Sequence, residues 1–248
     1  MNEQPLASVI MTAYNAEKYI KESIDSILNQ TYKNIELIIV LDGCTDNTEV
    51  EAENILIPYN GHFRVIKEKE NKGCPTGRTI AINSARGKYI LIQDADDISL
   101  LDRIEKQVNF MEENKDIFCV GGFASKIDEN GEICGEMIYP PEKHREIVDE
   151  IVNRCVNPII DPTTLFRTKD FFEVGGYSLD KNIYTVPDFD LWLRAILLGK
   201  KFYNIQEILT KYRVYDDSIT RSKKDMMIRH HMIVWGKFKE AYSRKLGK

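Results

Sequence analysis

The chain has 248 residues, 43% of them hydrophobic, which is enough for one large domain or two small ones with a packed core. Its formal net charge of -5 is unevenly distributed. Residues 221–248 hold nine Lys or Arg against two Asp or Glu, a charge of +7 that leaves -12 on the remainder. This acidic body argues against nucleic acid as a partner, while the basic tail favours an acidic surface.

Cysteine use and the N-terminus predict a cytoplasmic protein. The five cysteines form neither a CxxC pair nor a Cys/His zinc spacing, so we expect free thiols. No basic segment followed by a long apolar one opens the chain, which argues against a secretion signal. No apolar run approaches the ~20 residues that span a bilayer. Any membrane association is therefore expected to be peripheral, at the inner face of the cell membrane.

Predicted strands and helices alternate over the first part of the chain. Four apolar runs have the character of buried strands: Ser8–Tyr14, Ile35–Asp42, Phe63–Glu68 and Tyr89–Gln93. Apolar residues at helical spacing predict helices at residues 20–28 and 76–85. Because such alternation builds βαβ units, we expect an α/β fold with a mostly parallel central sheet flanked by helices. Ligands of these sheets bind at the carboxyl ends of the strands.

Three carboxylates, Asp94, Asp96 and Asp97, lie within four residues at the end of the fourth predicted strand. Carboxylates two residues apart can bind one cation and leave the rest of its coordination sphere to water and a substrate phosphate. The alternative is a solvated turn in which one Asp caps the next helix. Ser99 stands just ahead of a helical pattern at residues 100–111 and can supply that cap, which favours the cation site.

The second part of the chain has a different pattern. Strands are predicted at Ile117–Gly122, Ala124–Ile127 and Thr163–Arg167, and a glycine pair breaks the chain at residues 175–176. Residues 188–198 are apolar almost all round, which indicates a buried helix. We find no linker that would separate two independent domains.

Three polar residues each allow two interpretations. Asp42, at a strand end, either accepts a hydrogen bond from a base or ribose or forms a tight turn with Gly43. Arg78, near a helix start, either meets a diphosphate or balances the aspartate cluster. Asp188, at the start of the buried helix, is either a general base or an N-cap. Spacing alone leaves all three pairs open.

In this order the motifs resemble glycosyltransferase family 2, the inverting, metal-dependent enzymes of the GT-A fold. The matching segments are Ser8–Asn15, Ser26–Tyr32, Asp42–Asp46, Asn71–Gly73, Asp94–Asp97, Gly175–Tyr177, and Asp188 with Asp190–Trp192. The resemblance covers most of residues 6–220. It implies a GT-A domain at 1–220, with a nucleotide-sugar-binding half at 1–100 and an acceptor and catalytic-base half at 101–220. Residues 221–248 would then form a separate C-terminal helix.

The resemblance also implies roles for individual residues. The nucleotide site would consist of Thr12, Ala13, Tyr14, Asp42, Gly73, Arg78 and Asp94, with Tyr14 packing on the base and Asp42 accepting from its imide N–H. Asp94 and Asp96 would form the metal pair for Mg²⁺ or Mn²⁺, with Asp96 as the direct ligand. Asp188 would be the base that deprotonates the acceptor hydroxyl.

The chain departs from the family pattern at several positions. Leu41, Cys44 and Thr79 replace a frequent Asp, Ser and Asn. Pro187 replaces the Glu before the base, and Tyr215 stands where relatives often carry a His near the metal. Metal coordination would then rest on Asp96, waters and the diphosphate.

The activity that the resemblance implies is transfer of a hexose or N-acetylhexosamine, with inversion, from a nucleoside diphosphate sugar, UDP-linked by preference. The acceptor would be a polysaccharide or a lipid-linked oligosaccharide. Pro187 and Tyr215 keep an alternative open, a catalytically silent module that binds sugar nucleotides or glycans. A nucleotidyltransferase would need a Gly-rich, Arg-containing loop after the first strand, and residues 12–15 are not such a loop.

The basic tail allows two interpretations. A helix at residues 221–248 would carry apolar side chains beside many Lys and Arg, as helices on anionic membranes do. This would bring the protein to lipid-linked acceptors. Alternatively, Met227, Val234, Trp235 and Phe238 pack on the catalytic domain while the lysines are solvated.

Overall fold

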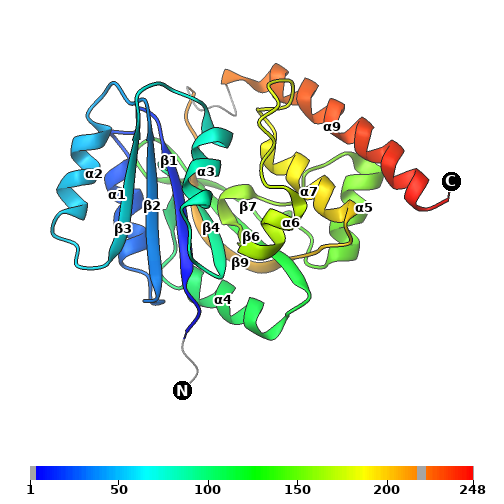
Figure 1. The fold of residues 1–248 in the computed structure, drawn as a ribbon, viewed down its shortest axis with the longest axis horizontal. Helices are drawn as coiled ribbons and strands as arrows, with labels where there is room; N and C mark the ends of the chain where they lie inside the picture. The colour runs from blue at the N-terminus through cyan, green and yellow to red at the C-terminus, as the bar shows by residue number, and fades with distance from the viewer. Residues whose placement is uncertain (1–3, 217–221, 248) are drawn as a thin grey trace.

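The computed structural model describes residues 4–216 and 222–247 and has one mixed sheet at its centre (Figure 1). The strand order is β3-β2-β1-β4-β8-β6-β9-β5, and β7 pairs with β6 outside this path. The first half supplies β1 (Ala7–Ala13), β2 (Ile35–Asp42), β3 (His62–Glu68) and β4 (Tyr89–Asp94). These four strands are parallel, as the alternation in the sequence predicts.

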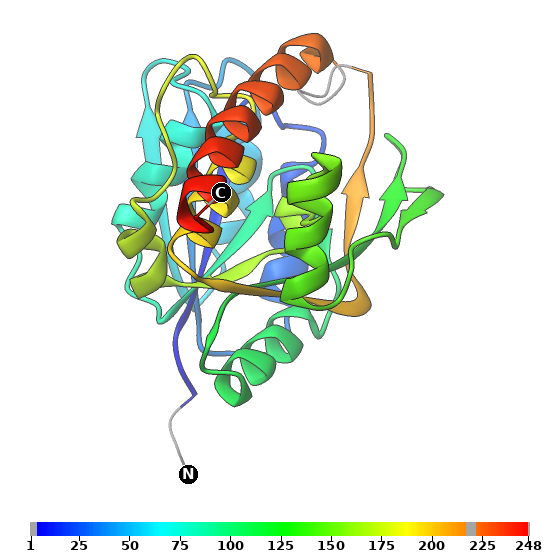
Figure 2. The same cartoon turned by 90° about the vertical axis from the view of Figure 1, so that its right-hand side faces the viewer.

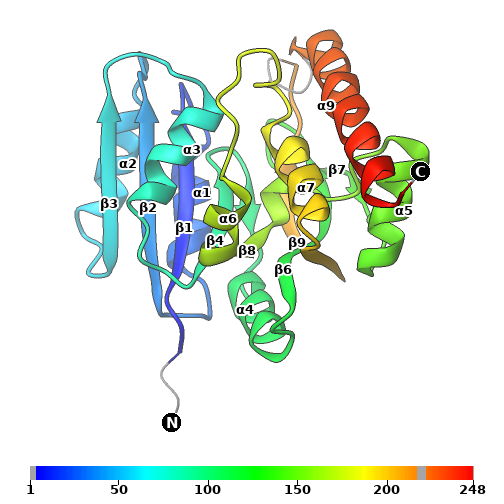
Figure 3. The same ribbon diagram turned by 45° about the vertical axis from the view of Figure 1, so that its right-hand side comes forward.

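Helices cover both faces of the parallel strands. One face packs against α1 (Ile20–Leu28), α2 (Thr48–Leu56) and α4 (Arg103–Glu113), and the other against α3 (Cys74–Asn83). β2 is buried along its whole length, because side chains from both of its faces point into these two layers. The same two-layer arrangement is visible when the molecule is turned (Figure 3).

The second half extends the sheet with strands of both directions. β4 is antiparallel to β8 (Leu165–Arg167), which is antiparallel to β6 (Ile117–Ile127). β9 (Lys201–Arg213) runs parallel to β6 and antiparallel to the short β5 (Ile98–Ser99). The remaining elements are β7 (Ile133–Met137), α5 (His144–Arg154), η1 (Asp161–Thr163), α6 (Thr168–Val174), α7 (Pro187–Leu197) and α9 (Lys224–Lys245).

Two local predictions differ from the structure. The strands predicted at 117–122 and 124–127 are one strand, β6, whose register against β9 shifts on both sides of Phe123. Ser99 does not cap α4. It lies in β5, where its hydroxyl donates to Gln93 Oε1 at 2.6 Å and accepts from Arg103 Nη1 at 2.9 Å. No side-chain cap bond is found at the Asp102 N-cap of α4. The aspartates at the end of β4 and directly after it therefore do not cap α4.

The C-terminal helix α9 lies across α7 (Figure 2). Val234 and Phe238 are buried in the contact, and the ring of His231 stacks on Phe189 of α7 with 3.9 Å between centroids. Trp235 Nε1 donates to the carbonyl of Ile151 in α5 at 2.7 Å. The packing proposed for the tail is therefore present. Among the described residues, no helix is both long enough and apolar enough to cross a membrane.

Candidate active site

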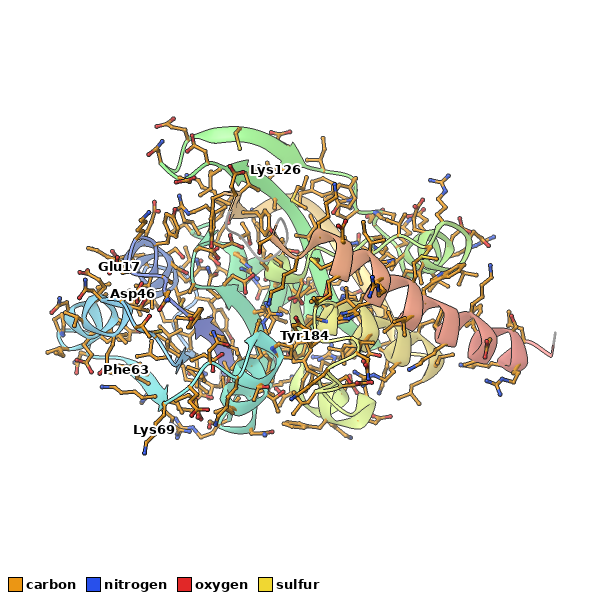
Figure 4. All side chains as sticks on the ribbon, turned by 90° about the horizontal axis from the view of Figure 1, so that it is seen from above. Glu17, Asp46, Phe63, Lys69, Lys126 and Tyr184 are labelled. Atoms are coloured by element: carbon orange, nitrogen blue, oxygen red, sulfur yellow. The ribbon has the colours of Figure 1, made fainter. Side chains whose placement is uncertain are left out.

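The predicted site residues gather at the carboxyl ends of β1, β2 and β4. Register explains why: Thr12 of β1 pairs with Asp94 of β4, and Ala13 pairs with Leu41 of β2, directly before Asp42. The loops that follow β1 and β2 are also in contact, and the Glu17 N–H of the first loop donates to Asp46 Oδ2 of the second at 3.1 Å. Glu17 and Asp46 are seen together in the view from above the strand ends (Figure 4).

The first predicted segment, Thr12 to Tyr14, presents only one large exposed side chain. Tyr14 is 50% exposed, whereas Ala13 is completely buried. Thr12 Oγ1 is buried without a hydrogen-bond partner among the described residues. Gly77 permits this close packing, since a Cβ at that position would lie 2.4 Å from Thr12 Cγ2. Tyr14 is thus the one large side chain of this segment that is open to solvent.

Asp42 organises the loop that precedes α3. Its side chain is buried, with Oδ1 accepting from the Lys72 N–H at 2.9 Å and Oδ2 from the Gly73 N–H at 2.8 Å. Gly73 has a left-handed φ of 87°, which glycine adopts without strain. Asp42 therefore holds Gly73 in place, in addition to any contact with a nucleoside.

Arg78, on α3, is bound by carboxylates. Its side chain is only 6% exposed, Nη2 donates to Asp94 Oδ1 at 2.7 Å, and Nη1 pairs with Asp161 Oδ2. The guanidinium carbon also lies 5.8 Å from the ring centroid of Tyr177. These contacts correspond to the second interpretation of Arg78, in which it balances the aspartate cluster.

Asp96 and Asp97 are tied to the end of β9. Tyr215 Oη donates to Asp96 Oδ2 at 2.9 Å, and the Arg213 N–H donates to Asp97 Oδ1 at 2.8 Å. The Arg213 Nε donates to the Asp96 carbonyl at 2.8 Å, while its guanidinium lies 4.5 Å from the ring centroid of Tyr19. Burial, together with repulsion from Asp94, raises the pKa of Asp96 to about 6. A cation at this position would relieve that repulsion.

Asp94 and Asp96 fit a hard divalent cation. Hydrogen bonds among the described residues occupy Asp94 Oδ1 and Asp96 Oδ2, which leaves one oxygen of each carboxylate available. Carboxylate oxygens are the ligands that Mg²⁺ and Mn²⁺ prefer. The described residues contain no cluster of three or more His, Cys, Asp or Glu placed to hold a metal, so water and substrate would supply the remaining ligands.

Asp188 lies at the start of α7, but it is not the N-cap. That position is Val186, which makes no side-chain cap bond. Asp188 Oδ2 accepts from Asn157 Nδ2 at 2.8 Å. Burial raises the pKa of Asp188, and the Phe189 N–H and the Arg78 charge partly oppose that effect. The neighbouring Asp190 instead pairs with Arg194 on the same helix at 2.8 Å. Of the two carboxylates of α7, Asp190 is thus held in an ion pair with an arginine, whereas Asp188 accepts from an amide.

Sequence reasoning missed Asp161 and Asn157, which complete the site from the segment before β8. The sequence does contain one signal: Asp161 lies in an apolar stretch, between Ile159–Ile160 and Pro162. A charged side chain in such a stretch needs a partner. That partner is Arg78, a distant residue that the local pattern does not indicate.

Residues 8–172 match the family model described as glycosyl transferase family 2. The chain belongs to this family. The family 2 chain is 38% identical over 239 residues to the uncharacterised glycosyltransferase MJ1057 of Methanocaldococcus jannaschii, covering 93% of this chain and 79% of that protein. It is 31% identical over 227 residues to TuaG of Bacillus subtilis strain 168, named for teichuronic acid biosynthesis, covering 90% and 84% of the two chains.

Solved structures show that this family 2 protein has the GT-A fold. The mannosyltransferase PcManGT of Pyrobaculum calidifontis, in complex with GDP-Man and Mn²⁺, aligns over 98% of this chain and 70% of its own, with a TM-score of 0.70 and 15% identity. S. aureus TarS 1-349 in complex with UDP-GlcNAc aligns over 96% of this chain and 72% of its own, with a TM-score of 0.68 and 17% identity. The predicted fold class is confirmed.

Proposed function

We propose that this family 2 glycosyltransferase transfers sugar with inversion, with Asp188 as the base. The observation that carries the proposal is that one short segment contacts both parts of the site. Asp161 pairs with Arg78, which binds Asp94 at the end of β4. Asn157 donates to Asp188 at the start of α7. A donor bound near Asp94 and Asp96 would therefore have a carboxylate beside it that can take a proton from an acceptor hydroxyl.

The chain's own residues divide the work of this reaction. Tyr14 would stack on the nucleoside base, and Asp94 and Asp96 would hold Mg²⁺ or Mn²⁺. A divalent cation there would neutralise charge that builds on the departing diphosphate. Asp188 would accept the proton of the attacking hydroxyl as the new bond forms at the anomeric carbon and the bond to the diphosphate breaks. Asn157, by donating to Asp188 Oδ2, would keep the other oxygen free to face the acceptor.

For the donor we propose a UDP-linked hexose or N-acetylhexosamine, and for the acceptor a polysaccharide or lipid-linked oligosaccharide. The UDP-GlcNAc complex of TarS and the biosynthetic name of TuaG support this choice. The GDP-Man complex of PcManGT shows that the same fold also accepts a guanine nucleotide, so GDP-sugars belong in the test.

A panel of nucleotide sugars with Mn²⁺, Mg²⁺ or EDTA tests the proposal without an acceptor. We expect slow release of nucleoside diphosphate from one UDP-sugar, abolished by EDTA and restored by Mn²⁺. Binding without hydrolysis or transfer across the panel would favour a silent binding module. Hydrolysis that resists EDTA would exclude the metal role of Asp94 and Asp96.

We also propose that the outer face of α9 contacts an anionic membrane. Met226, Ile228, Met232 and Ile233 are exposed on α9, although its inner face packs on α7. Lys224 and Arg229 are exposed near the same end of the helix. Each cation near an anionic surface contributes about 1 kcal/mol, and buried apolar side chains add to this. Lipid-linked acceptors would then be presented to the enzyme at that surface.

Substitution tests this better than truncation. Removing α9 would also remove the buried Val234 and Phe238, and would expose the face of α7 on which they pack. The intact protein should float with anionic liposomes at low salt and be released at high salt. The triple variant Ile228→Ser, Met232→Ser, Ile233→Ser should stay in the soluble fraction. Ile57→Ser, at the end of α2 and 78% exposed in the wild type, is the matched control and should still float. If the intact protein does not float, α9 is only a packing helix.

A further inference from the structure

Asp161 is a partner of Arg78 that lies outside the sequence motifs. It lies on η1, and its side chain is 11% exposed. Oδ2 pairs with Arg78 Nη1, whereas Oδ1 is buried without a hydrogen-bond partner among the described residues. Burying a charged group is costly unless it is paired, so Asp161 must gain enough from Arg78 to remain there.

The backbone around Asp161 is firmly held. The Thr163 hydroxyl donates to the Ile160 carbonyl at 2.6 Å and accepts from the Gly122 N–H at 3.1 Å. Gln107 Nε2 of α4 donates to the Thr163 carbonyl at 2.8 Å. A carboxylate on such a rigid turn can fix the position of a long, flexible Arg side chain.

The segment that carries Asp161 touches both parts of the site. Asn157, four residues earlier, donates to Asp188 Oδ2 at 2.8 Å, and Asp161 binds one end of Arg78. The other end of Arg78 binds Asp94. The donor-side carboxylate and the base are therefore connected through one Arg and one short segment.

We propose that Asp161 is a positioning residue that holds Arg78 against Asp94. This deepens the proposed function, on which it rests through the donor-binding role of Asp94. Without Asp161, one end of the buried Arg78 guanidinium would lose its carboxylate partner, and Arg78 would no longer be fixed beside Asp94.

Two substitutions test the contact. Asp161→Ala removes the partner of Arg78 Nη1, so the donor KM should rise about tenfold as Arg78 loosens from Asp94, whereas kcat should change much less. Asp161→Asn keeps an oxygen that can accept from Arg78, so this conservative variant should restore the donor KM to within a few fold of wild type.

A double-mutant cycle with Arg78→Lys tests the contact directly. Lys has one ammonium in place of the guanidinium whose two Nη atoms bind Asp94 and Asp161, so Arg78→Lys should raise the donor KM like Asp161→Ala. The double variant should be no worse than either single one. Asp170→Asn is the matched control. Asp170 lies on α6 and pairs with Lys200, so this variant should behave as wild type. Thermal unfolding and UDP binding of each variant report on folding.

A donor KM within twofold of wild type in Asp161→Ala would overturn the proposal. Additive effects in the cycle would overturn the contact with Arg78. The base assignment fails separately: if Asp188→Asn transfers sugar normally while the cycle shows coupling, Asp161 still positions Arg78 and the base must be sought elsewhere.

Discussion

Asp188→Asn should lower the rate of sugar transfer by about a hundredfold to ten-thousandfold while UDP binding stays within a few fold of wild type. Asparagine fills nearly the same volume and can still accept from Asn157, so the start of α7 should keep its geometry. What it lacks is the ability to accept a proton from the acceptor. The measurement is kcat for transfer, with UDP affinity determined by calorimetry on the same preparation.

Asp190→Asn is the matched control for this experiment. Asp190 lies two residues away on the same helix and pairs with Arg194, a partly exposed i,i+4 pair whose loss has a small effect. Transfer by Asp190→Asn should therefore remain within a few fold of wild type. Normal transfer by Asp188→Asn, or loss of transfer in Asp190→Asn alone, would move the base role away from Asp188.

Asp96→Asn should cut turnover by about a hundredfold or more, equivalent to about 3 kcal/mol of transition-state stabilisation. The amide can still accept from Tyr215, but it no longer attracts a divalent cation. The apparent Mn²⁺ affinity, measured by titrating donor hydrolysis, should fall together with turnover.

Asp102→Asn, on the half-exposed carboxylate at the start of α4, controls for the loss of one negative charge outside the metal pair. It should leave the Mn²⁺ titration unchanged. If wild-type enzyme treated with EDTA keeps full activity, the cation role of Asp94 and Asp96 is wrong whatever the Asp96 variant does.

Much of the fold could be predicted because its signals are local. The parallel strands are continuous apolar runs that both layers bury, and α3 begins near its prediction because Pro75 suits the first turn of a helix. β9 gave no such signal. Its side chains alternate poorly between buried and exposed, because its register against β6 shifts more than once along its length.

The site residues also fall into two groups, those that a local sequence signal indicates and those that it does not. Asp94, Asp96 and Asp188 lie in short motifs that follow a strand or open a helix, so their order along the chain could be matched to a family. The roles of Asp161 and Asn157 depend on partners far away in sequence, Arg78 and Asp188. Local patterns also could not show that both side-chain oxygens of Asp42 accept hydrogen bonds from the backbone N–H groups of Lys72 and Gly73.

The position of β9 has a consequence for the order in which the enzyme matures. The loop after β4 obtains two of its contacts from Arg213 and Tyr215, which are 116 and 119 residues downstream of Asp97 and Asp96. During synthesis the local βαβ units can assemble early, whereas pairing between such distant segments is slow. Under the proposed function, a nascent chain would bind the nucleotide before it can release that nucleotide from its sugar. Pulse-labelled chains stalled before β9 should bind UDP and leave UDP-sugars intact.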